Sequence, residues 1–129
     1  MKIMIVDDCS TTRKLFGLYL RAKGYEPVFA ENGLDAMEKI GASIINIVIT
    51  DLNMPYMDGI ELVKNLRNDP DNRHIPILMV TTEADEEEKR KAFEAGVNGY
   101  LVKPVTAEAV SQNIKKILKG FFRQESVNT

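Results

Sequence analysis

The chain has little of what several classes of protein require. It has one cysteine, Cys9, and no tryptophan among 129 residues. One cysteine excludes an intramolecular disulfide, which fits the reducing cytosol. The net charge of −2 provides no excess positive charge to attract nucleic acid or anionic lipid. No apolar run approaches a membrane span, and the apolar start ends too early at Asp7 and Asp8 for a signal peptide. These features predict a soluble cytoplasmic protein without membrane insertion.

Several chemical motifs are also missing from the sequence. No glycine-rich phosphate-binding run of the Walker or dinucleotide type occurs, so nucleotide binding through such loops is excluded. The only histidine, His74, stands in a loop pattern, and nothing in the sequence brings it near Cys9. Acidic neighbours are expected to raise the pKa of the Cys9 thiol and weaken it as a nucleophile. A thiol enzyme is therefore disfavoured.

Short apolar runs alternate with longer amphipathic stretches five times along the chain. The predicted strands span residues 3–6, 27–30, 47–50, 77–80 and 100–102. The first, third and fourth runs are almost continuously apolar, which is typical of parallel strands covered on both faces. A strand–helix alternation of this kind predicts an α/β fold, in which five helices cover both faces of a parallel five-stranded sheet.

Apolar stripes predict which helical faces are buried. Ser10 and Thr11 are candidate caps of the first helix, and Asn32 precedes the second. The pattern is lost after residue 120, so residues 1–120 are predicted to form one domain and residues 121–129 a fraying C-terminal tail. The stripes, helix by helix, are Leu15, Leu18, Tyr19 and Ala22; Met37, Ile40 and Ile44; Ile60, Val63 and Leu66; Ala92 and Phe93; and Val110, Ile114, Ile117, Leu118 and Phe121.

Polar and charged side chains follow four of the five predicted strands. In an open parallel sheet, functional residues gather at the carboxyl edge, so these side chains are expected to meet. Three carboxylates beside one lysine repel one another, so they either take up protons or bind a divalent cation. An all-oxygen set of ligands favours Mg²⁺ over Zn²⁺. The residues, in order, are Asp7 and Asp8, Asp51, Thr81 and Thr82, and Lys103 and Pro104.

Such a site predicts phosphoryl chemistry. An aspartate beside Mg²⁺ can attack a phosphoryl group and form an acyl phosphate. Transfer builds negative charge on the phosphoryl oxygens, which Mg²⁺, Lys103 and Thr81 would share.

Taken together, these motifs resemble the response-regulator receiver family. The resemblance covers residues 2 to about 119 and is strongest for the single-domain chemotaxis members. It implies a doubly wound, flavodoxin-like sheet with strand order 2-1-3-4-5. The motifs are Val6-Asp7-Asp8, Asp51-Leu52-Asn53-Met54-Pro55, Asp58-Gly59, Val80-Thr81, Tyr100 and Lys103-Pro104.

The resemblance implies a role for each matching residue around the acidic site. Asp51 is expected to accept a phosphoryl group from a sensor histidine kinase or a phosphotransfer protein. Asp7 and Asp8 are expected to hold Mg²⁺ together with Asp51 and the backbone carbonyl of Asn53. Lys103 is expected to bind the phosphoryl group. The chain would therefore be a response regulator of a two-component system.

The resemblance also implies a switch. Thr81 is expected to move its hydroxyl toward the phosphoryl group, and Tyr100 then to turn inward. This movement would change the surface of the fourth helix, fifth strand and fifth helix, where a downstream protein binds. Asn53 and Glu83 lie beside the expected phosphoryl site and are predicted to set the lifetime of the phosphoryl group.

The sequence departs from the family pattern in three places. Thr82 replaces a smaller residue and is expected to crowd access to the phosphoryl site. Val105 replaces an aromatic residue. The fourth helix begins with the acidic run 85–88, where the chemotaxis members are more basic. Acids before bases within one helix suit its dipole and give ion pairs, for example Glu86 with Arg90. The output face therefore need not fit a flagellar switch.

Two other functions compete with the signalling module. Aspartate-nucleophile phosphatases use Mg²⁺ and an acyl phosphate, but their second aspartate is a general acid, and Asn53 stands at that position. A flavin-binding protein of the same topology is disfavoured because the acidic edge would repel the flavin phosphate. The chain is therefore predicted not to be an enzyme. The start of the first strand directly after Met1 favours a stand-alone domain.

Overall fold

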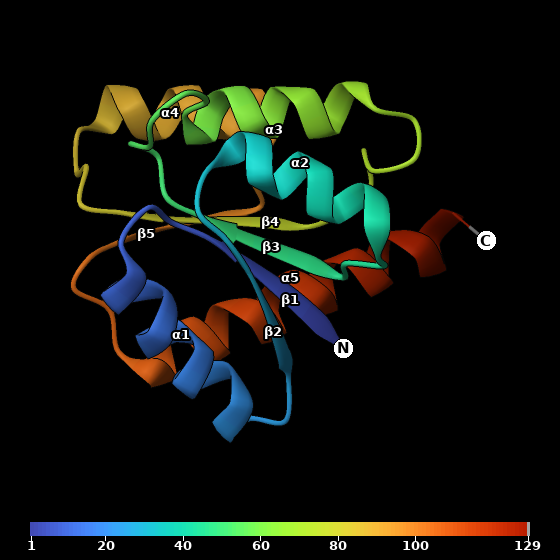
Figure 1. Cartoon of the computed structure of the whole chain (residues 1–129). Helices are drawn as coiled ribbons and strands as arrows, with labels where there is room; N and C mark the ends of the chain where they lie inside the picture. The colour runs from blue at the N-terminus through green and yellow to red at the C-terminus, as the bar shows by residue number, and fades with distance from the viewer. Residues whose placement is uncertain (129) are drawn as a thin grey trace.

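The computed structural model describes residues 1–128, with side chains described for residues 1–120. Strands and helices alternate throughout (Figure 1), and each predicted strand coincides with an observed one. The elements are β1 (Lys2–Val6), α1 (Ser10–Ala22), β2 (Glu26–Ala30), α2 (Gly33–Ala42), β3 (Ile47–Thr50), α3 (Gly59–Asn68), β4 (Ile77–Thr81), α4 (Glu86–Ala95), β5 (Gly99–Val102) and α5 (Ala107–Asn128).

All five strands are parallel, in the order β2-β1-β3-β4-β5. This order confirms the predicted fold. The chain first extends the sheet from β1 to β2 and then continues on the other side of β1 with β3. The strand order therefore reverses between β1 and β3, where α/β sheets of this kind bind their ligands. Val6 lies opposite Ala30 on one side and Thr50 on the other, so the residues that follow β1 and β3 emerge side by side.

Two layers of helices cover the sheet (Figure 1). α1 and α5 pack on one face, whereas α2, α3 and α4 pack on the other. Side chains alternate along each strand, so the central strands bury residues on both sides. Along β1, Ile3 and Ile5 join the cluster under α1 and α5, and Met4 and Val6 join the opposite one. The almost continuous apolar runs are explained by this double burial. No helix within the described residues is long and apolar enough to cross a membrane.

The buried face of α1 differs from the prediction. Leu15 and Leu18 are 44% and 63% exposed, whereas Phe16 and Leu20 are buried. The reason lies at Gly17, where a Cβ atom would come within 2.7 Å of the Phe29 ring. The face of α1 that contains Gly17 therefore packs against β2, and Phe16 and Leu20 on this side of the helix are buried in the core. Within the predicted stripe, Ala22 is exposed too and only Tyr19 is half-buried.

Helix starts follow the prediction at α2 but not at α1. Asn32 caps α2 and accepts the N–H of Asp35 through its side chain at 2.9 Å. In α1, however, Ser10 is the first helical residue, and Cys9 stands at the cap without a side-chain cap bond. Neither Ser10 nor Thr11 is therefore the cap.

The remaining stripes are largely confirmed. Val63 and Leu66 of α3 and Ile114 of α5 are buried, and Ile40 of α2 is only 5% exposed. Ile44 is 80% exposed because α2 ends before it. In α4, Ala92 is buried whereas Phe93 is 45% exposed. α5 continues to Asn128, past the predicted end at residue 120, and the side chain of Phe121 lies outside the described residues.

Candidate functional site

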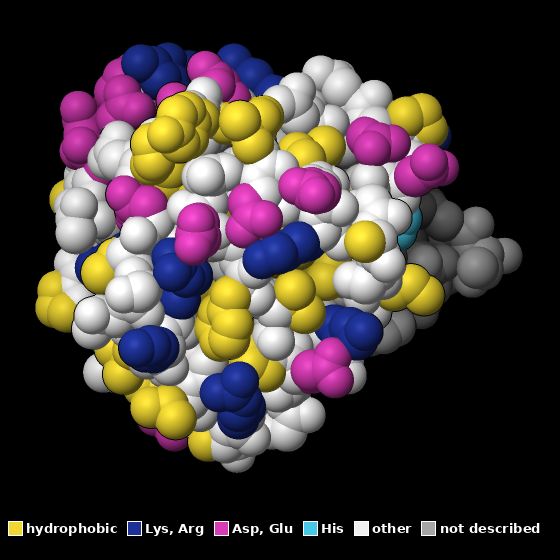
Figure 2. All heavy atoms as spheres, in the orientation of Figure 1, with side chains coloured by type: hydrophobic (Ala, Val, Ile, Leu, Met, Phe, Trp, Pro, Cys, Tyr) yellow, Lys and Arg dark blue, Asp and Glu magenta, His cyan; other side chains and the backbone are white. Residues whose placement is uncertain are grey.

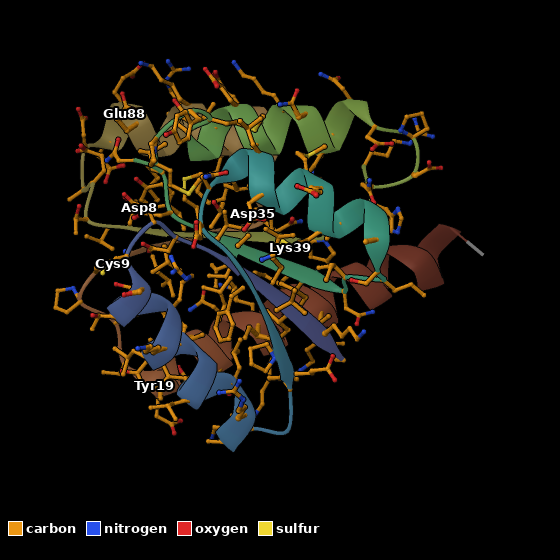
Figure 3. The ribbon with its side chains drawn as sticks, in the orientation of Figure 1. Asp8, Cys9, Tyr19, Asp35, Lys39 and Glu88 are labelled. Carbon is orange, nitrogen blue, oxygen red and sulfur yellow. The ribbon has the colours of Figure 1, made fainter. Side chains whose placement is uncertain are left out.

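The structure brings three carboxylates together at the carboxyl edge of the sheet. Asp7 and Asp8 follow β1, and Asp51 follows the neighbouring β3. One carboxylate oxygen from each residue lies within 4.8 Å of the other two. Asp7 is buried, Asp51 half-buried and Asp8 exposed. Figure 3 shows Asp8 where β1 passes into α1. The site is therefore reachable from solvent, with a buried floor. We refer to these three residues as the acidic site.

Lys103, at the end of β5, reaches into the acidic site. Its Nζ lies 2.9 Å from Asp7 Oδ2 and 3.2 Å from Asp51 Oδ2. Burial opposes the charge of Lys103, but its hydrogen bond to Asp7 and the charge of Asp51 outweigh burial and raise the pKa of the ammonium. One cation therefore faces three carboxylates, and the site stays negative. Its hard oxygen donors fit Mg²⁺, which takes carboxylate and water oxygens.

The backbone around Asp51 is fixed from several directions. Asp51 Oδ1 accepts the N–H of Leu52 at 2.7 Å, and the Thr50 hydroxyl donates to the Asp51 carbonyl at 2.9 Å. The N–H of Gly59, at the start of α3, donates to the Leu52 carbonyl at 2.7 Å. A Cβ atom on Gly59 would lie 2.2 Å from the Asp51 carbonyl oxygen. Only a residue without a side chain lets α3 approach Asp51 this closely.

Two residues outside the acidic site, Cys9 and Arg13, hold Asp7 in place. Arg13 Nη1 donates to the Asp7 carbonyl at 2.6 Å, and the N–H of Cys9 donates to Asp7 Oδ1 at 2.9 Å. No sequence motif singles out Arg13, because its contact is with a backbone atom. Its one available signal is its place on the first turns of the helix that follows Asp7.

Thr81 and Tyr100 lie on neighbouring strands beside the acidic site. Thr81 ends β4 and is fully buried, and its hydroxyl accepts the N–H of Glu83 at 3.3 Å. Its carbonyl accepts the N–H of Lys103 at 2.7 Å. The Tyr100 hydroxyl donates to the Glu83 carbonyl at 2.7 Å. Burial, followed by the charge of Glu83, raises the pKa of the Tyr100 phenol.

Asn53, Thr82 and Glu83 flank this arrangement on two loops. Asn53 is exposed on the β3–α3 loop, two residues after Asp51. Thr82 is exposed and lines an apolar pocket of about 380 Å³ that also contains Lys103 and Val105. Both loops border the acidic site, as the sequence predicts for residues that follow β3 and β4.

Comparison with known proteins agrees with this geometry. Residues 3–115 match the family model described as the response regulator receiver domain. The chain belongs to this family. It is 44% identical to the chemotaxis protein CheY-3 of Vibrio cholerae over 92% of each chain. It is 43% identical to CheY1 of Helicobacter pylori over 92% of this chain and 97% of the relative.

Solved receiver structures share the fold. CheY4 of Vibrio cholerae superposes with a TM-score of 0.85 at 34% identity, covering 90% of this chain and 97% of that one. A response regulator from Chloroflexus aurantiacus superposes with a TM-score of 0.87 at 36% identity, covering 92% of this chain and 97% of that one. The chain is thus a CheY-like receiver domain, consistent with phosphoryl acceptance and partner switching in two-component signalling. Proteins of this family are signalling proteins rather than classical enzymes, and they interact with histidine kinases and downstream targets.

The charged run on α4 of this receiver forms ion pairs within the helix. Arg90 pairs with Glu87 and Glu94, and Lys91 Nζ lies 3.3 Å from Glu88 Oε1. The expected pairing of Arg90 with Glu86 is wrong, because Arg90 bonds the residues three before it and four after it. Figure 2 shows the mixture of acidic and basic side chains over α4.

The thiol of Cys9 also differs from the prediction. Hydrogen bonds from Thr12 lower its pKa and outweigh burial and the charge of Asp7, both of which raise it. The thiol is exposed. His74 precedes β4, at the opposite edge of the sheet from Cys9, so the two residues cannot form a catalytic pair. The rejection of a thiol enzyme therefore rests on distance and not on the acidity of the thiol.

Proposed function

We propose that Asp51 accepts a phosphoryl group from a sensor histidine kinase or a phosphotransfer protein in a reaction that requires Mg²⁺. One observation carries this proposal. The Asp51 carboxylate lies in a cluster with Asp7 and Asp8 and is held by the Lys103 ammonium at 3.2 Å. A carboxylate among these groups is oriented, reachable from solvent and close to a cation that can bind the incoming phosphoryl oxygens.

The chemistry follows from these positions. An Asp51 oxygen attacks phosphorus as the bond from phosphorus to the donor's histidine nitrogen breaks, and the imidazole keeps the electron pair and takes up a proton. Asp7, Asp8, Asp51 and the backbone carbonyl of Asn53 would hold Mg²⁺, whose positive charge would offset the charge on the phosphoryl oxygens. The Lys103 ammonium exchanges part of its contact with Asp7 and Asp51 for a phosphoryl oxygen.

The switch we propose begins at Thr81. Its hydroxyl, which accepts a single long bond from Glu83, is available to donate to a phosphoryl oxygen on Asp51. Movement of Thr81 shifts the β4–α4 loop, whose Glu83 carbonyl holds the Tyr100 hydroxyl. Tyr100 therefore couples phosphorylation to a conformational change at the surface of α4, β5 and α5, where a downstream protein binds. We place this function in the cytoplasm and within residues 1–120, without direct binding to nucleic acid.

Asn53 and Glu83 are proposed to set the lifetime of the phosphoryl group. Both stand on loops that border Asp51, where their side chains can position or exclude an attacking water. Asn53→Ala and Glu83→Ala should each change the rate of dephosphorylation after the donor is removed. Unchanged rates in both variants would contradict this role.

A phosphatase is the second candidate, because it would use the same metal and nucleophile. It requires a general acid two residues after the nucleophile, and Asn53 cannot donate or accept that proton. We therefore favour the signalling function. Multiple turnover of a phosphomonoester by the wild type would reverse this choice.

Intact-mass spectrometry after incubation with acetyl phosphate tests the main proposal. Wild type should gain one phosphoryl adduct with Mg²⁺ and none with a chelator. Asp51→Asn should gain none. Asp58→Asn provides a matched control, since Asp58 only caps α3 through the N–H of Glu61 and asparagine caps equally well. An adduct on Asp51→Asn, or one that forms without Mg²⁺, would refute the proposal.

A further inference from the structure

The β3–α3 loop displays one residue in an unusual backbone conformation. Tyr56 has φ of 70°, the one positive value among the described residues other than glycine. A bulky side chain in this left-handed region is strained, because its Cβ crowds the following carbonyl. The Tyr56 side chain is nevertheless 83% exposed, so its own packing does not compensate for the strain. Strain of this kind, five residues after Asp51, points to a function for the displayed side chain.

The next residue holds Tyr56 in this conformation. Met57 packs on the start of α2, where a Cβ on Gly33 would lie 2.7 Å from the methionine sulfur. Met57 also packs against the core beneath α2 and α3, and its N–H donates to the Pro55 carbonyl at 2.8 Å. The loop therefore turns at Tyr56 because Met57 must point inward, and Tyr56 is projected outward in a fixed direction.

Tyr56 belongs to an exposed apolar patch beside the acidic site. Leu34, which follows Gly33 on α2, is 54% exposed, and Pro55 is exposed as well. We call Leu34, Pro55 and Tyr56 the loop patch. Figure 2 shows hydrophobic side chains gathered over the β3–α3 loop with acidic side chains next to them. Asp8 and Asp35 lie on this side of the molecule (Figure 3), and Glu31 is exposed on the neighbouring loop.

We propose that the loop patch is the docking anchor for the protein that donates the phosphoryl group. The inference rests on the proposed function of Asp51. A protein donor must bring its phosphohistidine to Asp51, so it must cover the loops at this edge. The acidic surroundings select a donor with basic residues around its histidine, and a rigid aromatic side chain inserts into an apolar recess on that donor. A small donor such as acetyl phosphate reaches Asp51 without this contact.

Replacement of Tyr56 separates docking from chemistry. Tyr56→Asn removes the aromatic ring but accepts the left-handed backbone, so the variant should be at least as resistant to urea as the wild type. Tyr56→Phe keeps the ring. Ile44→Asn is a matched control, because Ile44 is 80% exposed but precedes β3 at the opposite edge of the sheet. Two kinds of phosphoryl donor are used. One is acetyl phosphate; the other is a histidine-phosphorylated phosphotransfer domain, chosen from a panel as the one that phosphorylates the wild type fastest.

With acetyl phosphate, all four proteins should be phosphorylated at rates within about twofold of one another. With the phosphotransfer domain, Tyr56→Asn should lose roughly 30-fold in kcat/KM, the usual loss for an interface hot spot, whereas Tyr56→Phe and Ile44→Asn should keep the wild-type value. Higher salt should slow transfer to the wild type.

The two proposals fail in distinguishable ways. Absence of phosphorylation of wild type by acetyl phosphate would remove the proposed function itself. Transfer from the phosphotransfer domain to Tyr56→Asn at the wild-type rate would overturn docking at the loop patch alone. Docking would also be overturned if Tyr56→Asn lost stability or lost rate with acetyl phosphate, since Tyr56 would then serve the loop itself. The same conclusion holds if no domain phosphorylates wild type while acetyl phosphate does.

Discussion

Replacement of Gly59 by alanine tests whether the close approach of α3 positions Asp51. The new Cβ would lie 2.2 Å from the Asp51 carbonyl oxygen and 2.9 Å from Leu52 Cα. Both contacts are with backbone, which cannot rotate away as a side chain can. The β3–α3 connection must therefore move by about 1 Å to restore ordinary contact distances.

This displacement should cost both stability and phosphorylation rate. Overpacking of a buried site costs about 1–3 kcal/mol, which outweighs the gain of up to about 1 kcal/mol from placing alanine in a helix. Domains of this size keep roughly 5–15 kcal/mol, so Gly59→Ala should still fold at room temperature. A shift of about 1 Å in a catalytic group can reduce rates by roughly 100-fold. Urea unfolding and the rate of phosphorylation by acetyl phosphate measure the two effects.

Gly41→Ala provides the control, since a Cβ at Gly41 meets nothing within 4 Å and the residue lies within α2. It should raise stability by about 0.5–1 kcal/mol and leave phosphorylation unchanged. If Gly59→Ala were as stable as Gly41→Ala and equally reactive, α3 would not be what holds Asp51 in place, and the argument from close approach would be refuted.

Three further predictions concern a helix cap, a half-buried guanidinium and a phenol. Asn32→Ala should cost about 1 kcal/mol in urea unfolding, because the N–H of Asp35 loses its acceptor. Arg67→Lys should lower the free energy of unfolding by about 1–3 kcal/mol, because lysine cannot replace the guanidinium that donates to the Gly96 carbonyl and other acceptors. Arg67→Gln should lower it at least as much. The raised pKa of Tyr100 stabilises the fold below the ordinary value of 10.0, and this contribution is lost as the pH rises through the folded pKa. Tyr100→Phe should therefore lose less stability than wild type above pH 10, as urea titrations at several pH values will show; equal losses would contradict the assignment.

The strands and the location of the site could be predicted because each depends on a local pattern. An uninterrupted apolar run predicts a strand that is buried on both faces, and the polar residue after the run marks the carboxyl edge of the sheet. Asp7, Asp51 and Lys103 can be found in this way, and the structure places the Lys103 ammonium within hydrogen-bonding distance of both carboxylates. The order of the strands was not in the pattern and came from the family resemblance.

Other features depend on tertiary contacts that no local pattern contains. The apolar residues of α1 form two stripes one residue apart, and only the contact of Gly17 with Phe29 selects the buried one. The guanidinium of Arg13 bonds a backbone carbonyl, which carries no residue-specific signal. The lowered pKa of the Cys9 thiol depends on hydrogen bonds from the side chain and backbone of Thr12, whereas the sequence shows only acidic neighbours.

The position of Lys103 at the margin of the sheet has a consequence for local opening. The carboxylates directly follow β1 and β3, which are paired on both sides, whereas β5 pairs only with β4. An edge strand opens at a smaller free-energy cost than the centre of a sheet. When β5 opens, the acids stay together but lose the Lys103 ammonium that pairs with the carboxylates of Asp7 and Asp51, so the site gains negative charge without global unfolding. Hydrogen exchange in β5 thus reports how often the receiver exists with its three acids and without its lysine.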